Sequence, residues 1–116
     1  MTPEDAVRAF FEIYNTGPPE RFSEVVSRDY VDHGHTPPGR GPEGARDDYE
    51  HAVQLAGGVI RYEIEALVTL DDTVAAVFTG HLPSGSEFRG LGLYRVVDGM
   101  ILETRHAPIG PLPDFR

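Results

Sequence analysis

The chain has no cysteine and no lysine, and all ten of its basic residues are arginine. Without cysteine it cannot form disulfides, thiolate nucleophiles, or cysteine-ligated zinc and iron–sulfur sites. Without lysine it cannot use Schiff-base catalysis or a P-loop lysine. These absences exclude several large classes of enzyme before any motif is considered.

The chain also has little positive charge, because 19 acidic residues face 10 basic ones and the net charge is −9 at pH 7. Nucleic-acid binding depends on cationic contacts to phosphate, and no arginine cluster offsets the acidic background. We therefore expect no nucleic-acid partner. No window approaches the ~20 consecutive apolar residues of a membrane helix, so we expect no membrane partner either. The N-terminal "MTPEDAVRAF" lacks the regions of a signal peptide, which predicts a cytoplasmic location.

The length of 116 residues predicts a single domain over residues 1–116, and the first half has helical periodicity. Thr2 is predicted to cap the first helix, with Asp5 closing a capping box, and the helix should end at residues 15–19. A short second helix is predicted from Pro19 to about Val26. A third runs from about Pro42 to Gly57, and "SRDYVDHGH" forms an extended segment between them.

The second half has the period of two that is typical of strands. Strands are predicted over Ile60–Leu70, Thr73–Leu82, Glu87–Val97 and Met100–Ile109, with a strong hairpin signal at Asp98-Gly99. In the first of these strands, strict alternation predicts one apolar face made by Ile60, Tyr62, Ile64, Ala66, Val68 and Leu70. Three helices followed by an antiparallel meander predict an α+β domain.

Three strings occur in the same order as in a known superfamily: "YVDHGHTPPGRGPEGARDDYEHAV", "VIRYEIEALVTLDDTVAAVFTGHL" and "EFRGLGLYRVVDGMILE". On these strings the chain resembles the nuclear transport factor 2-like superfamily and, within it, the SnoaL-like polyketide cyclase group, over roughly Ala6 to Ala107. The resemblance implies a single SnoaL-like domain with a curved antiparallel sheet wrapped around three N-terminal helices. This cone would hold one deep pocket. Because members include cyclases, isomerases, epoxide hydrolases and proteins that only bind, fold alone does not set the activity.

Three histidines are the predicted catalytic residues. The cyclases resembled here carry an acid/base aspartate on the last strand, and "DGMILETRH" puts His106 at that position. Histidine, with an ordinary pKa of ~6.5, suits proton transfer near neutrality. His81, in "FTGHL", matches a pocket histidine of some cyclases, and His33 belongs to a "DH" pair common in the superfamily. We predict His106 and His81 as acid/base groups, assisted by His33. The alternative for each histidine is that it is a polar residue at a strand end with no catalytic role.

The other predicted site residues would bind ligand. Tyr62, Phe78, Phe88 and Tyr94 are predicted to form the pocket wall. Arg89 could reach a substrate carboxylate or carbonyl, and His35 is placed at the pocket rim. Asp32 is predicted to cap a turn, and Arg105 to pair with Glu103 on the outer face. His51 is assigned, together with Asp47, Asp48 and Glu50, to a solvated face of the third helix.

Metal binding is a second possibility for the histidines. His33 and His35 would share one face of an extended segment, and His81 with His106 could complete a set. The H-x-H spacing is a weak signal, however, and the family resembled is mostly metal-free. We therefore expect no metal and no cofactor.

These residues predict a cofactor-independent enzyme that performs acid/base chemistry on a small, mostly apolar carbonyl or epoxide compound. Aldol cyclisation, isomerisation and epoxide hydrolysis are the forms that the resemblance implies. The alternative is a non-catalytic protein of the same fold that binds a small hydrophobic molecule or acts as a dimeric interaction module. The resemblance also implies a homodimer through the outer face of the sheet. Arg61, Glu63, Glu65 and Arg95 predict that this interface is polar.

Overall fold

The structure, a computed structural model, describes residues 2–113 and confirms the predicted α+β class. The helices are α1 (Pro3–Thr16), α2 (Phe22–Val25) and α3 (Gly41–Ala56), with a 3-10 turn at Pro19–Arg21. The strands are β1 (Val26–Asp32), β2 (Gly39–Arg40), β3 (Arg61–Leu70), β4 (Thr73–His81), β5 (Glu87–Val97) and β6 (Met100–Ile109). The sequence did not predict β2, because two residues are too few to show a periodicity.

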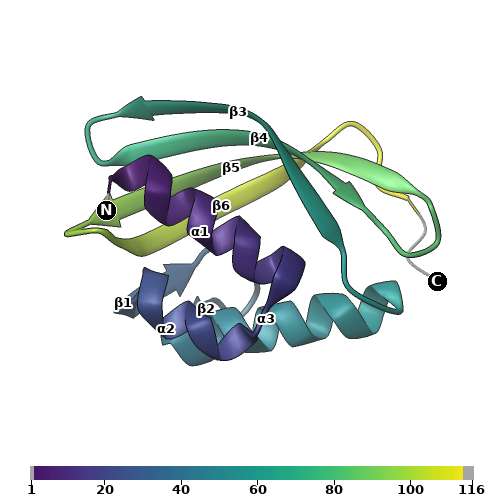
Figure 1. The fold of residues 1–116 in the computed structure, drawn as a ribbon, viewed down its shortest axis with the longest axis horizontal. Helices are drawn as coiled ribbons and strands as arrows, with labels where there is room; N and C mark the ends of the chain where they lie inside the picture. The colour runs from purple at the N-terminus through teal and green to yellow at the C-terminus, as the bar shows by residue number, and fades with distance from the viewer. Residues whose placement is uncertain (1, 114–116) are drawn as a thin grey trace.

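The six strands form one curved sheet in the order β2-β1-β6-β5-β4-β3. All neighbours are antiparallel except β1 and β6, which run parallel. Helix α1 packs inside the curve against β3 to β6, and α3 packs against β1 and β2 (Figure 1). None of the helices in residues 2–113 is long and apolar enough to cross a membrane.

The helix ends follow the predicted capping chemistry. The Thr2 hydroxyl accepts a hydrogen bond from the Asp5 N–H (3.1 Å), and the Asp5 carboxylate accepts one from the Thr2 N–H (3.0 Å). This capping box satisfies two of the N–H groups that a helix start leaves without partners. Helix α3 ends at Gly57, whose φ of 76° is the left-handed conformation that glycine adopts without strain.

A β-bulge in β3 overturns part of the predicted alternation. Ile64 pairs with Phe78 and Ala66 with Val77, so Glu65 is an extra residue on β3. Such an insertion moves every later side chain to the opposite face of the sheet. Val68 and Leu70 are consequently 66% and 74% exposed. The single apolar face predicted for this strand is therefore wrong beyond Ile64.

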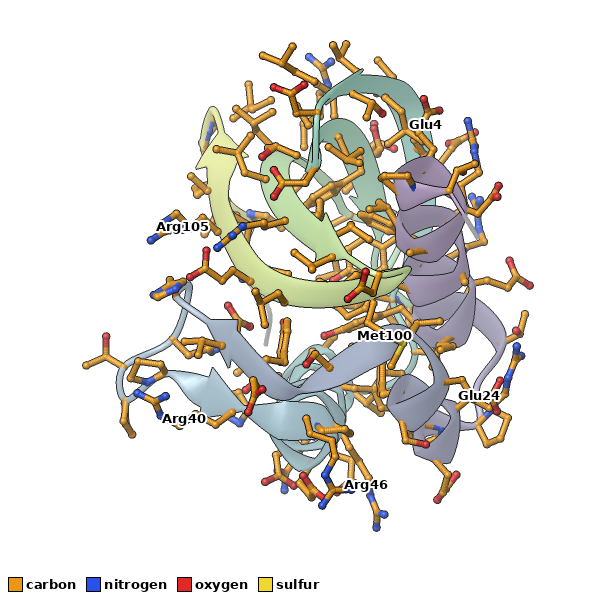
Figure 2. The ribbon with its side chains drawn as sticks, turned by 90° about the vertical axis from the view of Figure 1, so that its left-hand side faces the viewer. Glu4, Glu24, Arg40, Arg46, Met100 and Arg105 are labelled. Carbon is orange, nitrogen blue, oxygen red and sulfur yellow. The ribbon has the colours of Figure 1, made fainter. Side chains whose placement is uncertain are left out.

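The bulge also changes the character of the outer sheet face. Apolar residues pair across β3, β4 and β5 at the centre of this face. We call them the outer patch: Ala66, Val68, Ala75, Val77, Leu91 and Leu93. Ion pairs surround it, with Arg89 on Glu65 (2.6 Å) and Arg95 on Asp72 (3.2 Å). The sheet face that was predicted to be polar is thus apolar at its centre and charged at its rim. Arg105 lies on the side of the sheet away from α1 (Figure 2) and pairs with Glu103 (3.7 Å), as predicted.

Candidate functional site

Two adjoining cavities lie between the concave face of the sheet and the helices. The inner cavity, of about 160 Å³, is lined mainly by aromatic residues: Phe10, Phe11, Tyr14, Tyr62, Phe78 and Tyr94. The outer cavity, of about 430 Å³, is lined in part by Leu55, Ile60, Phe88, Ala107, Pro108 and Leu112. Both cavities share His35, Asp48 and His106, together with Ala52, Tyr62 and Phe78. The polar side chains therefore sit where the two cavities meet.

The parallel pairing of β1 with β6 positions two of these polar residues. Asp32 is in register with Thr104, and side chains alternate along both strands. Asp32 and His106 therefore point to the same inner side, as do Tyr30 and Thr104, whose hydroxyl oxygens are 2.9 Å apart. Because these strands lie far apart in the sequence, no local pattern indicates that Asp32 and His106 are neighbours.

Asp32 lies at the centre of a polar cluster that also contains His35, Asp48 and His106. Its side chain is only 7% exposed, and Oδ1 accepts a hydrogen bond from the Gly34 N–H (2.8 Å), which confirms the predicted turn cap. The same Oδ1 lies 3.6 Å from His106 Nε2, and Oδ2 lies 3.2 Å from His35 Nε2. One buried carboxylate thus contacts both imidazoles, whose ring centroids are 5.7 Å apart.

The fourth member is Asp48, which the sequence analysis placed on the solvated face of α3. Its Oδ2 lies 3.6 Å from His35 Nε2, and that oxygen is buried without a hydrogen-bond partner among residues 2–113. Asp48 lies three residues after Ala45, which is buried, and four before Ala52, which lines both cavities. Spacings of three and four put all three residues on one helix face, so this was the signal that could have located Asp48.

The two carboxyl groups have opposite pKa shifts. Burial raises the pKa of Asp48 to about 7, and the neighbouring Asp32 carboxylate reinforces the shift. Burial alone would also raise the pKa of Asp32. Contacts from His106, the Gly34 N–H and Asp48 outweigh it and lower that pKa to about 2. Near neutrality Asp32 is therefore ionised, and Asp48 is close to its own titration point.

The His106 ring fits because residue 34 is glycine. A Cβ atom at position 34 would collide with the Nε2 end of the imidazole. The contact with Asp32 raises the pKa of His106 above its ordinary value, and partial desolvation opposes this. His106 thus gains basicity from a fixed carboxylate while 42% of its side chain remains exposed.

The structure brings together most, but not all, of the predicted site residues. His106, His35, Tyr62, Phe78, Phe88 and Tyr94 line the cavities. His33, His81 and Arg89 line neither of them. Strand alternation explains why His33 and His81 do not line the cavities. His33 directly follows Asp32, which points inward, and His81 lies on the outer face together with Thr79.

Each of these three residues has an acidic partner instead. His33 pairs with Glu103 (3.6 Å), His81 with Glu63 (3.1 Å) and Arg89 with Glu65 (2.6 Å). His51 lines the outer cavity although it is exposed.

The geometry also bears on metal binding. Asp32, His35 and His106 each offer a ligand atom, and these atoms lie within 4.8 Å of one another. Two imidazoles and a carboxylate are a donor set that divalent transition metals accept. This set differs from the four histidines considered from the sequence, because neither His33 nor His81 is part of it. Assays on this site therefore need a chelator as a control.

The curved sheet, the enclosed α1 and the cavities between them are features of nuclear transport factor 2-like proteins. The sequence profile of the SnoaL-like domain family matches residues 7–104, and the chain belongs to that family. No curated protein matches the chain.

Several solved structures have the same fold. IdmH of Streptomyces antibioticus, a proposed polyketide cyclase, is 25% identical, with 93% of this chain and 92% of that chain covered and a TM-score of 0.76. A proposed polyketide cyclase of Bacillus cereus is 27% identical, with 89% and 71% covered and a TM-score of 0.75. A cystatin-like protein of Methylobium petroleophilum is 19% identical, with 97% and 78% covered and a TM-score of 0.79.

Proposed function

We propose that this protein is a cofactor-independent enzyme that transfers protons on a small, mostly apolar carbonyl or epoxide compound. The observation that carries the proposal is the contact between His106 and the buried Asp32 at the junction of the two cavities. The likeness to proposed polyketide cyclases at 25% and 27% identity supports aldol cyclisation as one form of this chemistry. Isomerisation and epoxide hydrolysis use the same elements.

In the proposed mechanism His106 is the general base. Its Nε2 faces Asp32, which leaves Nδ1 as the nitrogen that takes a proton from the carbon next to a ligand carbonyl. The ionised Asp32 stabilises the imidazolium that forms, and the bonding electrons move onto the carbonyl oxygen as an enolate. A tyrosine hydroxyl in the inner cavity, from Tyr62 or Tyr94, would donate a hydrogen bond to that oxygen. The His106 imidazolium exchanges its proton with solvent and returns one to the carbon, which completes the exchange.

Hydrogen exchange on a simple ketone tests this proposal without knowledge of the natural substrate. We expect the protein to accelerate incorporation of deuterium next to the carbonyl of 2-tetralone in D₂O, measured by NMR with EDTA present. An acceleration that EDTA abolishes would indicate metal chemistry instead. The same rate with and without protein, despite saturable binding of the ketone, would contradict the proposal.

A non-catalytic binding protein is the second candidate function. It is favoured by one observation, the histidine at the position where the cyclases resembled here carry their aspartate. In that case the cavities would bind the probe ketone and no exchange would follow. The exchange assay therefore separates the two functions.

We also propose that two copies of the chain associate through the outer patch. An apolar centre with a charged rim is the usual composition of a stable protein interface, and Leu91 and Leu93 are 40% and 43% exposed in the single chain. We expect a dimer at micromolar concentration by light scattering, and a monomer for Leu93→Arg. Val59→Arg, at an exposed apolar position outside the outer patch, is the control and should stay dimeric. A monomeric wild type would rule out the homodimer.

A further inference from the structure

Asp48 is a carboxyl group in the cavities that the proposed proton transfer does not use. Its Oδ2 is buried and accepts no hydrogen bond within residues 2–113; the ionised Asp32 carboxylate beside it can only accept a hydrogen bond from a protonated Asp48, and His35 Nε2 is 3.6 Å away. That distance is too long for a hydrogen bond. A buried acceptor without a donor is costly and needs a specific explanation. A ligand that brings its own N–H group is one explanation.

The charges around the cavities favour a positive ligand. Asp32 and Asp48 both line the inner cavity, whereas no arginine lines either cavity among the described residues, and the chain has no lysine. His106 contacts Asp32, so Asp32 has its own counter-charge. Asp48 shares its imidazole neighbour, His35 (3.6 Å), with Asp32, to which His35 lies closer (3.2 Å). An anionic ligand would find no arginine or lysine side chain here among the described residues.

The aromatic walls of the inner cavity also favour a positively charged ligand. Its lining holds seven aromatic side chains: Phe10, Phe11, Tyr14, Tyr30, Tyr62, Phe78 and Tyr94. Aromatic faces attract ammonium groups through their ring quadrupole, and this attraction is strongest where water is excluded. The outer cavity adds apolar surface from Leu55, Ile60 and Phe88. The site thus combines a carboxylate, aromatic rings and an adjoining apolar compartment.

We infer that the natural ligand is an organic cation: an amine whose protonated nitrogen pairs with Asp48 and whose apolar body fills the cavities. This inference rests on the proposed function only in placing the ligand in the same cavities. It narrows the substrate class to carbonyl or epoxide compounds that also carry a basic nitrogen. The burial that raises the pKa of Asp48 supports it, because a bound ammonium group would draw the carboxyl group into its ionised form.

Four probes with one bicyclic body test the inference: 2-aminotetralin, 2-tetralol, 2-tetralone and tetralin-2-carboxylate. With EDTA present at pH 8, we expect the amine to bind about tenfold or more tightly than the alcohol, by NMR titration. The carboxylate should bind most weakly. Asp48→Asn should remove the preference for the amine, and Asp47→Asn, at the neighbouring exposed position, should retain it.

The wild type provides a test that does not depend on the folding of a variant. At pH 8 the wild type itself should bind the amine more tightly than the alcohol, and the carboxylate more weakly than either. Equal affinities for amine and alcohol, or a preference that survives Asp48→Asn, would overturn the inference. Tightest binding of the ketone would also overturn it, because Asp48 would then act as a hydrogen-bond donor. If the protein accelerates exchange on 2-tetralone but does not prefer the amine, the inference fails and the proposed function stands. If it prefers the amine but does not accelerate exchange, the proposed function fails and the inference stands.

Discussion

His106→Ala is expected to slow deuterium exchange on 2-tetralone by about 100- to 10,000-fold, the usual contribution of a positioned general base. The substitution removes the imidazole that contacts Asp32 Oδ1 and lines both cavities. It leaves the aromatic walls in place, so binding of the ketone should change little. The rate of exchange at saturating ketone, followed by NMR, measures the effect.

His33→Ala and His81→Ala are matched controls for this experiment. Both histidines have acidic partners outside the cavities, Glu103 for His33 and Glu63 for His81, so their removal should leave the exchange rate within about twofold of wild type. Gly34→Ala tests the positioning of His106, because the added methyl group occupies the place of its Nε2. We expect this variant to lower both the exchange rate and the His106 pKa. A His106→Ala enzyme as fast as wild type would remove His106 from the mechanism.

The fold was predictable from the sequence because its determinants are local. The capping box at Thr2, the glycine at the end of α3 and the Asp98-Gly99 hairpin each act over a few residues, and the structure confirms them. The β3 bulge was not predictable, because an extra residue within a regular alternation leaves the apolar pattern unchanged. That one insertion decides whether Val68 and Leu70 face the core or the outer side of the sheet.

The site was less predictable than the fold, since it depends on pairing between distant segments. His106 could be found from the resemblance, but its contact with Asp32 arises from the parallel pairing of β1 with β6. Alternation could show that Asp32 and His33 point in opposite directions, without showing which of them faces inward. For Asp48 the helical spacing was available, and the acidic residues around it obscured the signal.

Asp48→Asn is expected to change the pH dependence of stability more than any other single substitution at the site. The pKa of Asp48 is about 7 in the folded chain and 3.8 ordinarily, so between these values the folded state binds a proton that the unfolded state has lost. Stability therefore falls as pH rises from about 4 to about 7, by about 4 kcal/mol at most. His106 acts in the same direction at higher pH, because its pKa is also raised. The lowered pKa of Asp32 matters only below pH 4, where it makes stability rise with pH.

Asparagine has the shape of a protonated aspartate and does not titrate, so Asp48→Asn should remove the decline between pH 4 and pH 7. The variant and the wild type should be similar near pH 4. Near pH 8 the variant should be the more stable by about 2 to 4 kcal/mol, measured by urea unfolding. Asp47→Asn should follow the wild-type curve, because residue 47 is exposed. A difference between wild type and Asp48→Asn that stays constant from pH 4 to pH 8 would mean that Asp48 does not titrate near neutrality.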